Sequence, residues 1–285
     1  MNNSKELCQP LCLPFECCEM DSRSLEFPQQ ECTHYFAELV LLRRGRLHVQ
    51  MDREEFCLSP EEAVFFCPGV RHLVRPEDEE PVCLDLIRLD PDRLPPMPAY
   101  SPCWTGVLAD ARRGGMPMRF SAREAQELGL SDLCARCVSE AREQAFGYDL
   151  NVTSNLTLLC MALIRFWLSR GMSLTAREGQ QDPVFALPRY IQQHLRDGLR
   201  VEDLAARCGL SYPWFAKKFR EIYGISCKDY IEQIRVAQVE QYLRFTDLDL
   251  NQISEATGYA DCSHMIKNFK RIMEITPGQY RMKRL

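Results

Sequence analysis

The sequence of 285 residues predicts an α+β protein of two domains, an N-terminal β-barrel with two helices and a C-terminal all-α domain. Three observations support this prediction. Short apolar runs separated by Gly, Pro and charged residues fill 35–89, helical periodicity begins at 121, and every segment after 183 has the period of a short helix. With 46% hydrophobic and 26% charged residues, the composition is globular and excludes a disordered or collagen-like chain.

The N-terminal domain begins with an irregular arm. Residues 1–30 carry Pro10, Pro14 and Pro28 and show little periodicity. Apolar runs then predict the strands of a small β-barrel or sandwich, at 35–42, 47–51, 63–66 and 82–89. The segment 90–118 holds six prolines, so we expect no regular structure there.

Two helices follow the predicted barrel. Ser121 and Glu124 have the spacing of a capping box, which predicts a helix start. One apolar stripe then runs along a helix, through Leu130, Leu133, Cys134, Cys137, Val138 and Ala141. A second helix, about 154–170, is apolar almost all round, which predicts burial against the first helix or another subunit. The polar segment 171–183 is the predicted linker, between domains at 31–170 and 184–285.

The last hundred residues contain an internal repeat. Six positions recur at an offset of 49 residues before a turn and 50 after it: Leu204, Gly209, Phe219, Gly224, Ile225 and Tyr230 correspond to Ile253, Gly258, Phe269, Glu274, Ile275 and Tyr280. Each copy predicts two helices joined by a Gly turn, at 201–208 and 214–222 and again at 250–257 and 263–272, with Ser211 and Asp261 as N-caps. This is a helix-turn-helix, whose second helix fits the DNA major groove.

The charge distribution agrees with a DNA-binding half. The whole chain has a net charge of −5, which by itself argues against nucleic acid. Residues 183–285 hold 16 Lys and Arg against 12 Asp and Glu, a net charge of +4, and the remaining residues have a net charge of −9. Basic residues recur on both candidate recognition helices: Lys217, Lys218 and Arg220 on the first, and Lys267, Lys270 and Arg271 on the second.

Residues 184–285 resemble the DNA-binding domain of the AraC/XylS family of transcription regulators. The residues that carry the resemblance are Leu204-Ala205-x3-Gly209-Leu210-Ser211, Phe215-x3-Phe219, Gly224, Tyr230-Ile231-x3-Arg235, Ile253-x4-Gly258-Tyr259, Phe269-Lys270 and Thr276-Pro277-x2-Tyr280-Arg281. A long helix at 226–243 joins the two halves, and Thr276 followed by Pro277 is a favourable helix start.

The resemblance also assigns DNA contacts. It implies that seven residues face the bases: Pro213, Ala216, Lys217, Cys262, Ser263, Ile266 and Lys267. Lysines at such positions can donate to guanine, and Ile266 can touch a thymine methyl. Five further basic residues are interpreted as phosphate contacts or scaffold: Lys218, Arg220, Arg235, Lys270 and Arg271. Phe215 and Phe219 are interpreted as core residues, a role also open to Trp214.

Three positions depart from the family pattern. Ser254 stands in place of an alanine, Met265 in place of an aromatic residue and Glu274 in place of a glycine. The first two are modest packing changes. Glu274 puts the local turn in doubt, because Gly is favoured where φ is positive.

The N-terminal half resembles, more loosely, the cupin-like effector domain of the same family. The residues are Cys32-x-His34-x3-Glu38-x6-Gly45 and Pro68-Gly69-x2-His72. We predict an effector pocket that includes His34, Glu38 and His72, with no metal or other cofactor. The alternative is a metal ion held by Cys32, His34, Glu38 and His72, in a metal-sensing regulator. A cupin metalloenzyme is the least favoured, since it would not explain the duplicated helix-turn-helix; we therefore predict no enzyme activity.

The sequence has 15 cysteines, most of them interpreted as small, buried and reduced. Cys134 and Cys137 fit the helical stripe and are expected in the core. A second alternative is a zinc or redox-sensing group at the N-terminus, formed by Cys8, Cys12, Cys17, Cys18 and Cys32.

Together these patterns predict a cytoplasmic transcription regulator that binds double-stranded DNA and an unidentified small-molecule effector. The first thirty residues lack the features of a secretory signal, and the longest apolar stretch, 156–168, is shorter than the ~20 residues of a membrane span. A homodimer formed through the helices of 121–170 would engage two half-sites. The resemblance further implies RNA polymerase as a partner, and activation or repression is left open.

Overall fold

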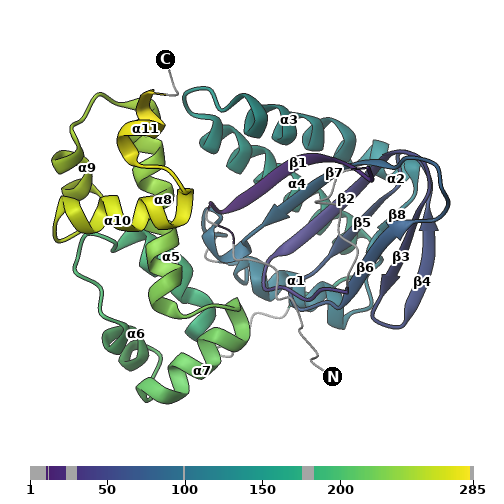
Figure 1. Cartoon of the computed structure of the whole chain (residues 1–285). Helices are drawn as coiled ribbons and strands as arrows, with labels where there is room; N and C mark the ends of the chain where they lie inside the picture. The colour runs from purple at the N-terminus through teal and green to yellow at the C-terminus, as the bar shows by residue number, and fades with distance from the viewer. Residues whose placement is uncertain (1–10, 12, 24–30, 99, 175–182, 283–285) are drawn as a thin grey trace, which may run out of the picture. The chain divides into compact units, whose positions relative to one another are not determined.

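The computed structural model describes residues 11, 13–23, 31–98, 100–174 and 183–282 (Figure 1). The chain divides into two compact units, Met1–Gln181 and Asp182–Leu285, and the division falls inside the segment 171–183. The two units are an N-terminal unit built on β-sheets and a C-terminal unit built of helices, as the sequence predicts.

The strands of the first unit form two antiparallel sheets. One sheet has the order β1 (Phe15–Asp21), β7 (Cys83–Leu89), β2 (Ala37–Arg44), β5 (Ala63–Phe66) and β8 (Arg119–Phe120). The other has the order β4 (Glu54–Leu58), β3 (Leu47–Met51) and β6 (His72–Pro76). The predicted β-sheet domain is therefore present, but its described strands pair as two separate sheets, so the barrel is not closed.

Strand β2 is central to the larger sheet. It pairs with β7 on one side and β5 on the other, and its first six residues are buried. Helix α3 (Leu130–Glu143) packs on α4 (Tyr148–Ser169) and contacts β1, β7 and β2, so these helices cover one face of the sheet (Figure 1). Trp167 of α4 lies near Phe65 of β5, with ring centroids 5.9 Å apart. Helix α4 is therefore apolar because it is buried against α3 and the sheet. Burial against the preceding helix was one of the two predicted explanations, the other being contact with another subunit.

Helix α2 (Ala122–Glu127) begins where the sequence predicts. The Ser121 hydroxyl accepts from the backbone N–H of Glu124, and the Glu124 carboxylate accepts from the backbone N–H of Ser121 at 3.0 Å. This is the reciprocal capping box. The buried residues Leu130, Cys134, Cys137 and Val138 confirm most of the predicted stripe of α3.

Two predicted irregular segments contain regular structure. Part of the expected N-terminal arm is strand β1, which pairs with β7 from Phe15 opposite Leu89 to Asp21 opposite Cys83. The proline-rich segment 90–118 contains the short helix η1 (Pro91–Arg93) and helix α1 (Trp104–Arg113). Helix α1 lies in the proline-free interval between Pro102 and Pro117, where nothing prevents its backbone hydrogen bonds.

The second unit is entirely helical over its described residues. Its elements are η2 (Pro183–Ala186), α5 (Leu187–Gln193), α6 (Val201–Arg207), α7 (Tyr212–Tyr223), α8 (Cys227–Phe245), α9 (Leu250–Ala256), α10 (Cys262–Met273) and α11 (Pro277–Met282). The pairs α6–α7 and α9–α10 are the two predicted helix-turn-helix units, and α8 is the predicted connecting helix. The Ser226 hydroxyl caps α8 by accepting from the backbone N–H of Asp229 at 3.1 Å.

Candidate nucleic-acid interface and effector site

Helix α7 has one buried face and one exposed face. Phe215, Phe219 and Tyr223 lie four residues apart and are buried, which confirms the core interpretation of the two phenylalanines. The spacing places Pro213 and Lys217 on the opposite face, where both are exposed. Ala216 is half-buried at the edge between the two faces. Helix α7 therefore offers a lysine and a proline to solvent, held by an aromatic core.

Helix α10 repeats this arrangement with different residues. Met265 and Phe269 are fully buried, so the methionine fills the place of the expected aromatic residue. Ser263 and Lys267 are exposed on the other face, while Cys262 and Ile266 are half-buried and pack against the core cluster. The Asp261 carboxylate accepts from the backbone N–H of His264 at 2.7 Å and so confirms the predicted N-cap. Ser211, at the corresponding position before α7, makes no such bond.

The predicted phosphate contacts separate into two groups. Arg220, Lys270 and Arg271 are exposed, and Lys218 is half-buried. The Arg235 side chain is only 12% exposed; its Nη1 donates to Glu232 Oε1 at 3.0 Å, and its guanidinium lies over the Tyr259 ring. Of the two roles left open for Arg235, these contacts favour the scaffold role over a phosphate contact, because the guanidinium is held inside the domain by the buried Glu232.

Glu232 also joins the long helix to the second recognition helix. Asn268 of α10 donates through Nδ2 to Glu232 Oε2 at 2.8 Å, and the same amide lies 3.0 Å from His264 Nε2. Arg235, Glu232 and Asn268 thus form a buried polar network that fixes α10 on α8. Because a half-satisfied buried network is costly, this network specifies the position of α10.

Two exposed aromatic residues lie at the start of α7. Trp214 is 66% exposed and Tyr212 is 51% exposed, so the core role that was open to Trp214 is wrong. The Lys217 ammonium lies 5.7 Å from the centre of the Trp214 ring, within the range of a cation–π interaction. Exposed apolar side chains that lie close together can mark an interaction surface. Their place one turn before Lys217 marks them as candidate DNA contacts that the sequence patterns did not single out.

The turn after α10 has the conformation that the sequence put in doubt. Glu274 has φ +61° and ψ −4°, in the left-handed region, where its counterpart Gly224 has φ +78°. The turn is therefore kept, with a side chain in a conformation that costs L-residues ~1–2 kcal/mol. Ser254 is buried at 3% exposure, which agrees with a packing substitution.

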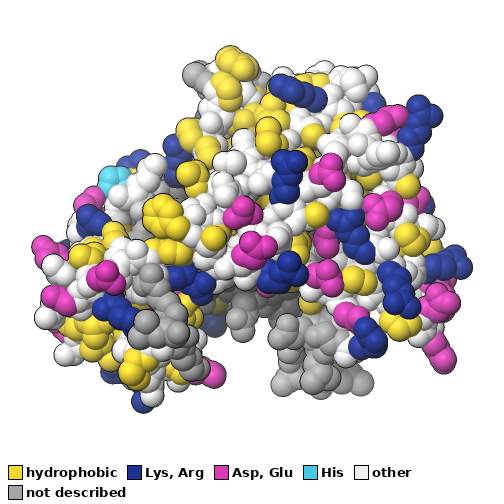
Figure 2. Space-filling model, turned by 90° about the horizontal axis from the view of Figure 1, so that it is seen from above, with side chains coloured by type: hydrophobic (Ala, Val, Ile, Leu, Met, Phe, Trp, Pro, Cys, Tyr) yellow, Lys and Arg dark blue, Asp and Glu magenta, His cyan; other side chains and the backbone are white. Residues whose placement is uncertain are grey.

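Basic and acidic side chains are mixed on one face of the chain. On the face shown in Figure 2, Lys and Arg side chains lie among Asp and Glu side chains. Non-specific attraction to DNA depends on the local excess of positive charge.

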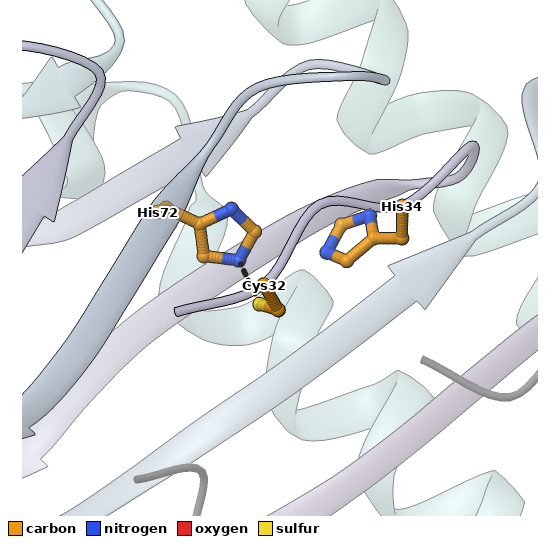
Figure 3. Close-up of side chains that lie close together, drawn as sticks. All are labelled: Cys32, His34 and His72. Atoms are coloured by element: carbon orange, nitrogen blue, oxygen red, sulfur yellow. Dashed lines mark hydrogen bonds between the residues drawn. The ribbon is translucent and has the colours of Figure 1, made fainter. Parts of the chain in front are cut away.

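The four residues of the cupin-like pattern meet in the first unit. Glu38 on β2 is 2% exposed, and its carboxylate lies 3.5 Å from His34 Nε2 and 3.4 Å from His72 Nε2. Cys32 Sγ lies 3.2 Å from the same nitrogen of His72 (Figure 3). The predicted pocket residues His34, Glu38 and His72 are thus adjacent and buried rather than spread along an open cavity.

Arg88 of β7 holds the Glu38 carboxylate in place by donating from Nε at 2.8 Å. Burial alone would raise the pKa of Glu38, but its contacts with His34, His72 and Arg88 hold that pKa well below its ordinary value. The carboxylate is therefore ionised and places a fixed negative charge between two imidazoles.

Five of the ten described cysteines of the first unit are buried, and the others are half-buried or exposed. Cys134 and Cys137 lie in the core, as predicted, and Cys17 is buried beside Cys137. The hydrogen bond with Cys137, together with burial, raises the pKa of the Cys17 thiol, and burial raises that of Cys134. Such thiols stay protonated and react slowly. Cys8 and Cys12 of the predicted N-terminal thiol group lie outside the described residues.

One helix of the described residues, α4, has the length and composition that could cross a membrane. Its inner side holds Leu156, Leu163 and Trp167, which are buried in the first unit. Core helices of soluble proteins pass the same test, so this finding is weak evidence for a membrane.

Two protein families match the chain. The family described as AraC-like ligand binding domain matches residues 17–102, and a family described as helix-turn-helix domain matches residues 204–283. The first match covers most strands of the first unit, and the second covers both α6–α7 and α9–α10.

Similar proteins carry regulatory names. The regulatory protein PocR of Salmonella typhimurium is 32% identical over 93 residues, which are 33% of this chain and 31% of PocR. The transcriptional activator RhaS of Escherichia fergusonii is 22% identical over 261 residues, 90% of this chain and 88% of RhaS. The match to PocR, like that to the MmsAB operon regulatory protein of Pseudomonas aeruginosa, spans about a third of the relative's length.

Two solved structures show the extent of the likeness. The DNA-binding domain of AdpA, in complex with a target DNA, is 25% identical and covers 36% of this chain and 93% of that domain, with a TM-score of 0.35. ToxT of Vibrio cholerae is 11% identical and covers 96% of this chain and 98% of ToxT, with a TM-score of 0.44. The two family matches, on the two units that the fold separates, assign the chain to the AraC/XylS family, with an AraC-like ligand-binding domain followed by a double helix-turn-helix domain.

Proposed function

We propose that the chain is a sequence-specific DNA-binding transcription regulator whose affinity for DNA is controlled by an effector bound in the first unit. The observation that carries the proposal is the repeated design of α7 and α10. Each is a 12-residue helix with a buried aromatic or apolar face and an exposed lysine at the corresponding position, Lys217 and Lys267. A helix of this kind fits the major groove, and lysine can donate to guanine O6 and N7.

The proposed base-facing set is the one given by the sequence: Pro213, Ala216, Lys217, Cys262, Ser263, Ile266 and Lys267. The exposed Lys270, Arg271 and Arg220 are proposed to contact phosphates, together with Lys218. Tyr212 and Trp214 join the interface because both are exposed at the N-terminal turn of α7. Arg235 is left out, since Glu232 engages it.

Selection of binding sites from a random DNA pool by the full-length protein tests this proposal. We expect enrichment of one sequence, and an affinity for it that falls as salt rises because lysines and arginines displace counterions. The double variant Lys217→Ala with Lys267→Ala should lose the enrichment. Lys228→Ala, which removes an exposed lysine of α8, should keep it. A wild-type pool that stays random after selection would refute sequence-specific binding.

A homodimer is proposed on the exposed apolar side of α4. Leu150 is 70% exposed, Leu158 is 58% exposed and Leu168 is 40% exposed, and these positions fall along one side of the helix. Sedimentation equilibrium should give a dimer for the wild type and a monomer for Leu158→Glu. If Leu158→Glu remained a dimer, α4 would not be the dimer interface.

The proposal places the protein in the cytoplasm and implies contact with RNA polymerase at its promoters. RhaS, together with NphR of Rhodococcus, is named a transcriptional activator, and activation is accordingly the proposed direction of control. No enzyme activity is proposed, because a DNA-binding regulator needs none.

A further inference from the structure

We propose that Cys32, His34 and His72 form a binding site for a divalent transition-metal ion, best suited to zinc, in the first unit (Figure 3). The three ligand atoms, one sulfur and two nitrogens, all lie within 4.8 Å of one another. His72 belongs to β6, whereas Cys32 and His34 precede β2, so the site joins the segment before β2 to the smaller sheet.

The orientation of both imidazole rings prepares them as ligands. His34 Nδ1 lies 2.8 Å from the carbonyl oxygen of Phe36, and His72 Nδ1 lies 3.1 Å from that of Val70. A carbonyl oxygen only accepts, so each Nδ1 carries the proton and donates it. In the neutral ring the Nε2 atom then bears a lone pair, and both Nε2 atoms point toward the cluster (Figure 3). Histidines that bind metals are commonly fixed through the second nitrogen in this way.

The spacing of the polar atoms suits a shared ion. His72 Nε2 lies 3.2 Å from Cys32 Sγ and 3.4 Å from Glu38 Oε1, and His34 Nε2 lies 3.5 Å from Glu38 Oε2. Zinc–nitrogen and zinc–sulfur bonds of ~2.0–2.3 Å place two ligands of one tetrahedral ion about 3.3–3.8 Å apart. The side chains therefore need only small movements to close around an ion.

One atom of the cluster lacks a hydrogen-bond partner. His34 Nε2 is buried and makes no hydrogen bond, although its ring is packed face to face on Phe36 with centroids 3.8 Å apart. His72 is stacked in the same way on Phe66, at 3.9 Å. Stacking prevents either ring from turning to a new partner. A buried nitrogen held in place without a hydrogen-bond partner is costly, and coordination to a cation would satisfy it.

A carboxyl group lies beside the cluster and could serve as a further ligand. Glu38 lies against both histidines, and Arg88 donates to one of its oxygens. Arg88 Nη1 also binds Glu16 at 3.0 Å, so the arginine is shared between two carboxylates. A thiolate at Cys32 would add a further negative charge when the ion binds. Cys32 is half-buried, whereas His34 and His72 are buried, which leaves the sulfur side as the entry path.

The donor set selects the kind of metal. Calcium and magnesium prefer oxygen ligands, whereas thiolate sulfur and imidazole nitrogen favour zinc and its neighbours in the first transition series. Three protein ligands leave a fourth position for water or for the Glu38 carboxylate beside it. The proposed ion is therefore zinc, with cobalt(II) as a spectroscopic substitute.

The regulatory part of this inference rests on the proposed function. Cys32 and His72 exchange backbone hydrogen bonds of 2.9 and 3.0 Å, which form an isolated bridge between the segment before β2 and β6. An ion on the side chains of the same two residues would strengthen this bridge. If the first unit controls DNA binding, the protein has one state that binds DNA and one that does not. The metal ion acts as an effector only if these two states differ in their affinity for it.

A second cluster supplies a matched control. His48, Cys57 and Glu77 also lie within 4.8 Å of one another, but Cys57 is half-buried and Glu77 is exposed on the surface of the smaller sheet. His48 Nδ1 contacts Glu77 and its Nε2 contacts Glu55, so both ring nitrogens are engaged. Cys57→Ser removes a thiol from this cluster and leaves the proposed site intact.

The first experiment measures the metal itself. Full-length protein purified without chelator is analysed for metal content, stripped, and titrated with cobalt(II) while absorbance is recorded. We expect one ion per chain, with a sulfur-to-cobalt charge-transfer band and the intense visible bands of a tetrahedral centre. Cys32→Ser should abolish the charge-transfer band and weaken zinc binding roughly 100-fold, while Cys57→Ser should leave both unchanged. His34→Gln, checked for folding by circular dichroism, should weaken binding to a similar degree.

Several outcomes overturn the site: no stoichiometric metal and no cobalt bands, or bands that survive Cys32→Ser and vanish in Cys57→Ser. The second experiment measures affinity for the selected DNA with added zinc and with chelator. We expect a change that Cys32→Ser removes. An unchanged affinity in a protein that binds one zinc overturns the regulatory part alone. Failure to bind DNA under either condition overturns the proposed function, and the cobalt spectrum still decides the site.

Discussion

Gly258 lies directly against the backbone of Leu195, so that a Cβ atom added to this glycine would come within 2.1 Å of the Leu195 carbonyl oxygen. This contact lies at the turn between α9 and α10. Arg196 beside it donates from Nε to the Ala256 carbonyl at 2.6 Å and from Nη2 to the Tyr242 hydroxyl at 3.1 Å. The segment after α5 is thus docked on the second helix-turn-helix through a turn that admits no side chain.

Gly258→Ala should therefore destabilise the second unit by about 3 kcal/mol or more, because it adds a backbone clash to the strain of a positive φ. Gly209→Ala is the matched control. Gly209 has a similar φ, +67° against +74°, but nothing lies within 4 Å of an added Cβ. It should cost only about 1 kcal/mol. Urea unfolding of the two variants measures the difference, and equal losses would show that the Leu195 contact is unimportant.

Glu274→Gly should stabilise the second unit by about 1 kcal/mol. The side chain at φ +61° costs more than glycine would, and the residue is exposed, so little packing is lost. Glu274→Ala keeps a Cβ atom and should bring no gain. Thermal unfolding of the three proteins provides the comparison. A gain in the alanine variant equal to that in the glycine variant would point to the carboxylate rather than the backbone.

Lys217→Ala and Lys267→Ala should each relax base preference at a different position of the binding site. A specific lysine–base contact contributes about 1–3 kcal/mol of discrimination. Competition binding with single-base variants of the selected site locates each loss. If both substitutions weakened binding to every sequence equally, these lysines would be phosphate contacts.

Arg271→Ala should act in the opposite way. Its side chain is exposed on α10, beyond the base-facing positions, so its loss should weaken binding to all sequences to a similar extent. The slope of log affinity against log salt should fall in magnitude by about one unit. Anisotropy titrations at four salt concentrations measure the slope. An altered base preference in this variant would assign Arg271 to the bases instead.

Asp92→Asn should make the first unit less sensitive to pH. Burial, together with the neighbouring Asp90 carboxylate, raises the pKa of Asp92 to about 8. An unfolded aspartate has a lower pKa, so the folded state binds more protons between about pH 4 and 8, and stability falls as the pH rises across this range. Asparagine keeps an acceptor for the Thr105 hydroxyl, which lies 2.5 Å from Asp92 Oδ1.

At pH 8 we therefore expect the asparagine variant to be more stable than the wild type by a few kcal/mol, and at pH 5 the difference should be small. Thermal unfolding between pH 5 and 8 gives both values. A constant difference across this range would show that Asp92 is ionised in the folded protein throughout.

The second unit could be predicted closely from the sequence because its signals are local. The Gly turns, the N-cap Asp261 and the spacing of Phe215 and Phe219 each act within a few residues. For Arg235 the sequence could not decide between a phosphate contact and a scaffold role, for the opposite reason. Its burial depends on Glu232, Tyr259 and the Leu195 carbonyl, which no local pattern reveals.

The first unit was harder to predict because its strands depend on distant partners. Strand β1 reads as part of a proline-rich arm until β7 supplies its hydrogen bonds. Strands β4 and β6 are short and polar and are stabilised by pairing on either side of β3. The candidate metal ligands were all found in the sequence. Only the structure showed that their Nε2 atoms converge, since this depends on which carbonyl each Nδ1 binds.

The two helix-turn-helix units are related by duplication but are not equivalent. Gly209 precedes the N-cap Ser211 by two residues, whereas Gly258 precedes the N-cap Asp261 by three. The two turns therefore present their second helices differently, and the residues offered at corresponding places, such as Pro213 and Ser263, differ as well. A single chain bound across two successive major grooves consequently has a direction along the DNA. Reversing the operator relative to the promoter would reverse the direction in which the bound regulator faces. Regulation would then depend on the orientation of the operator as much as on its sequence.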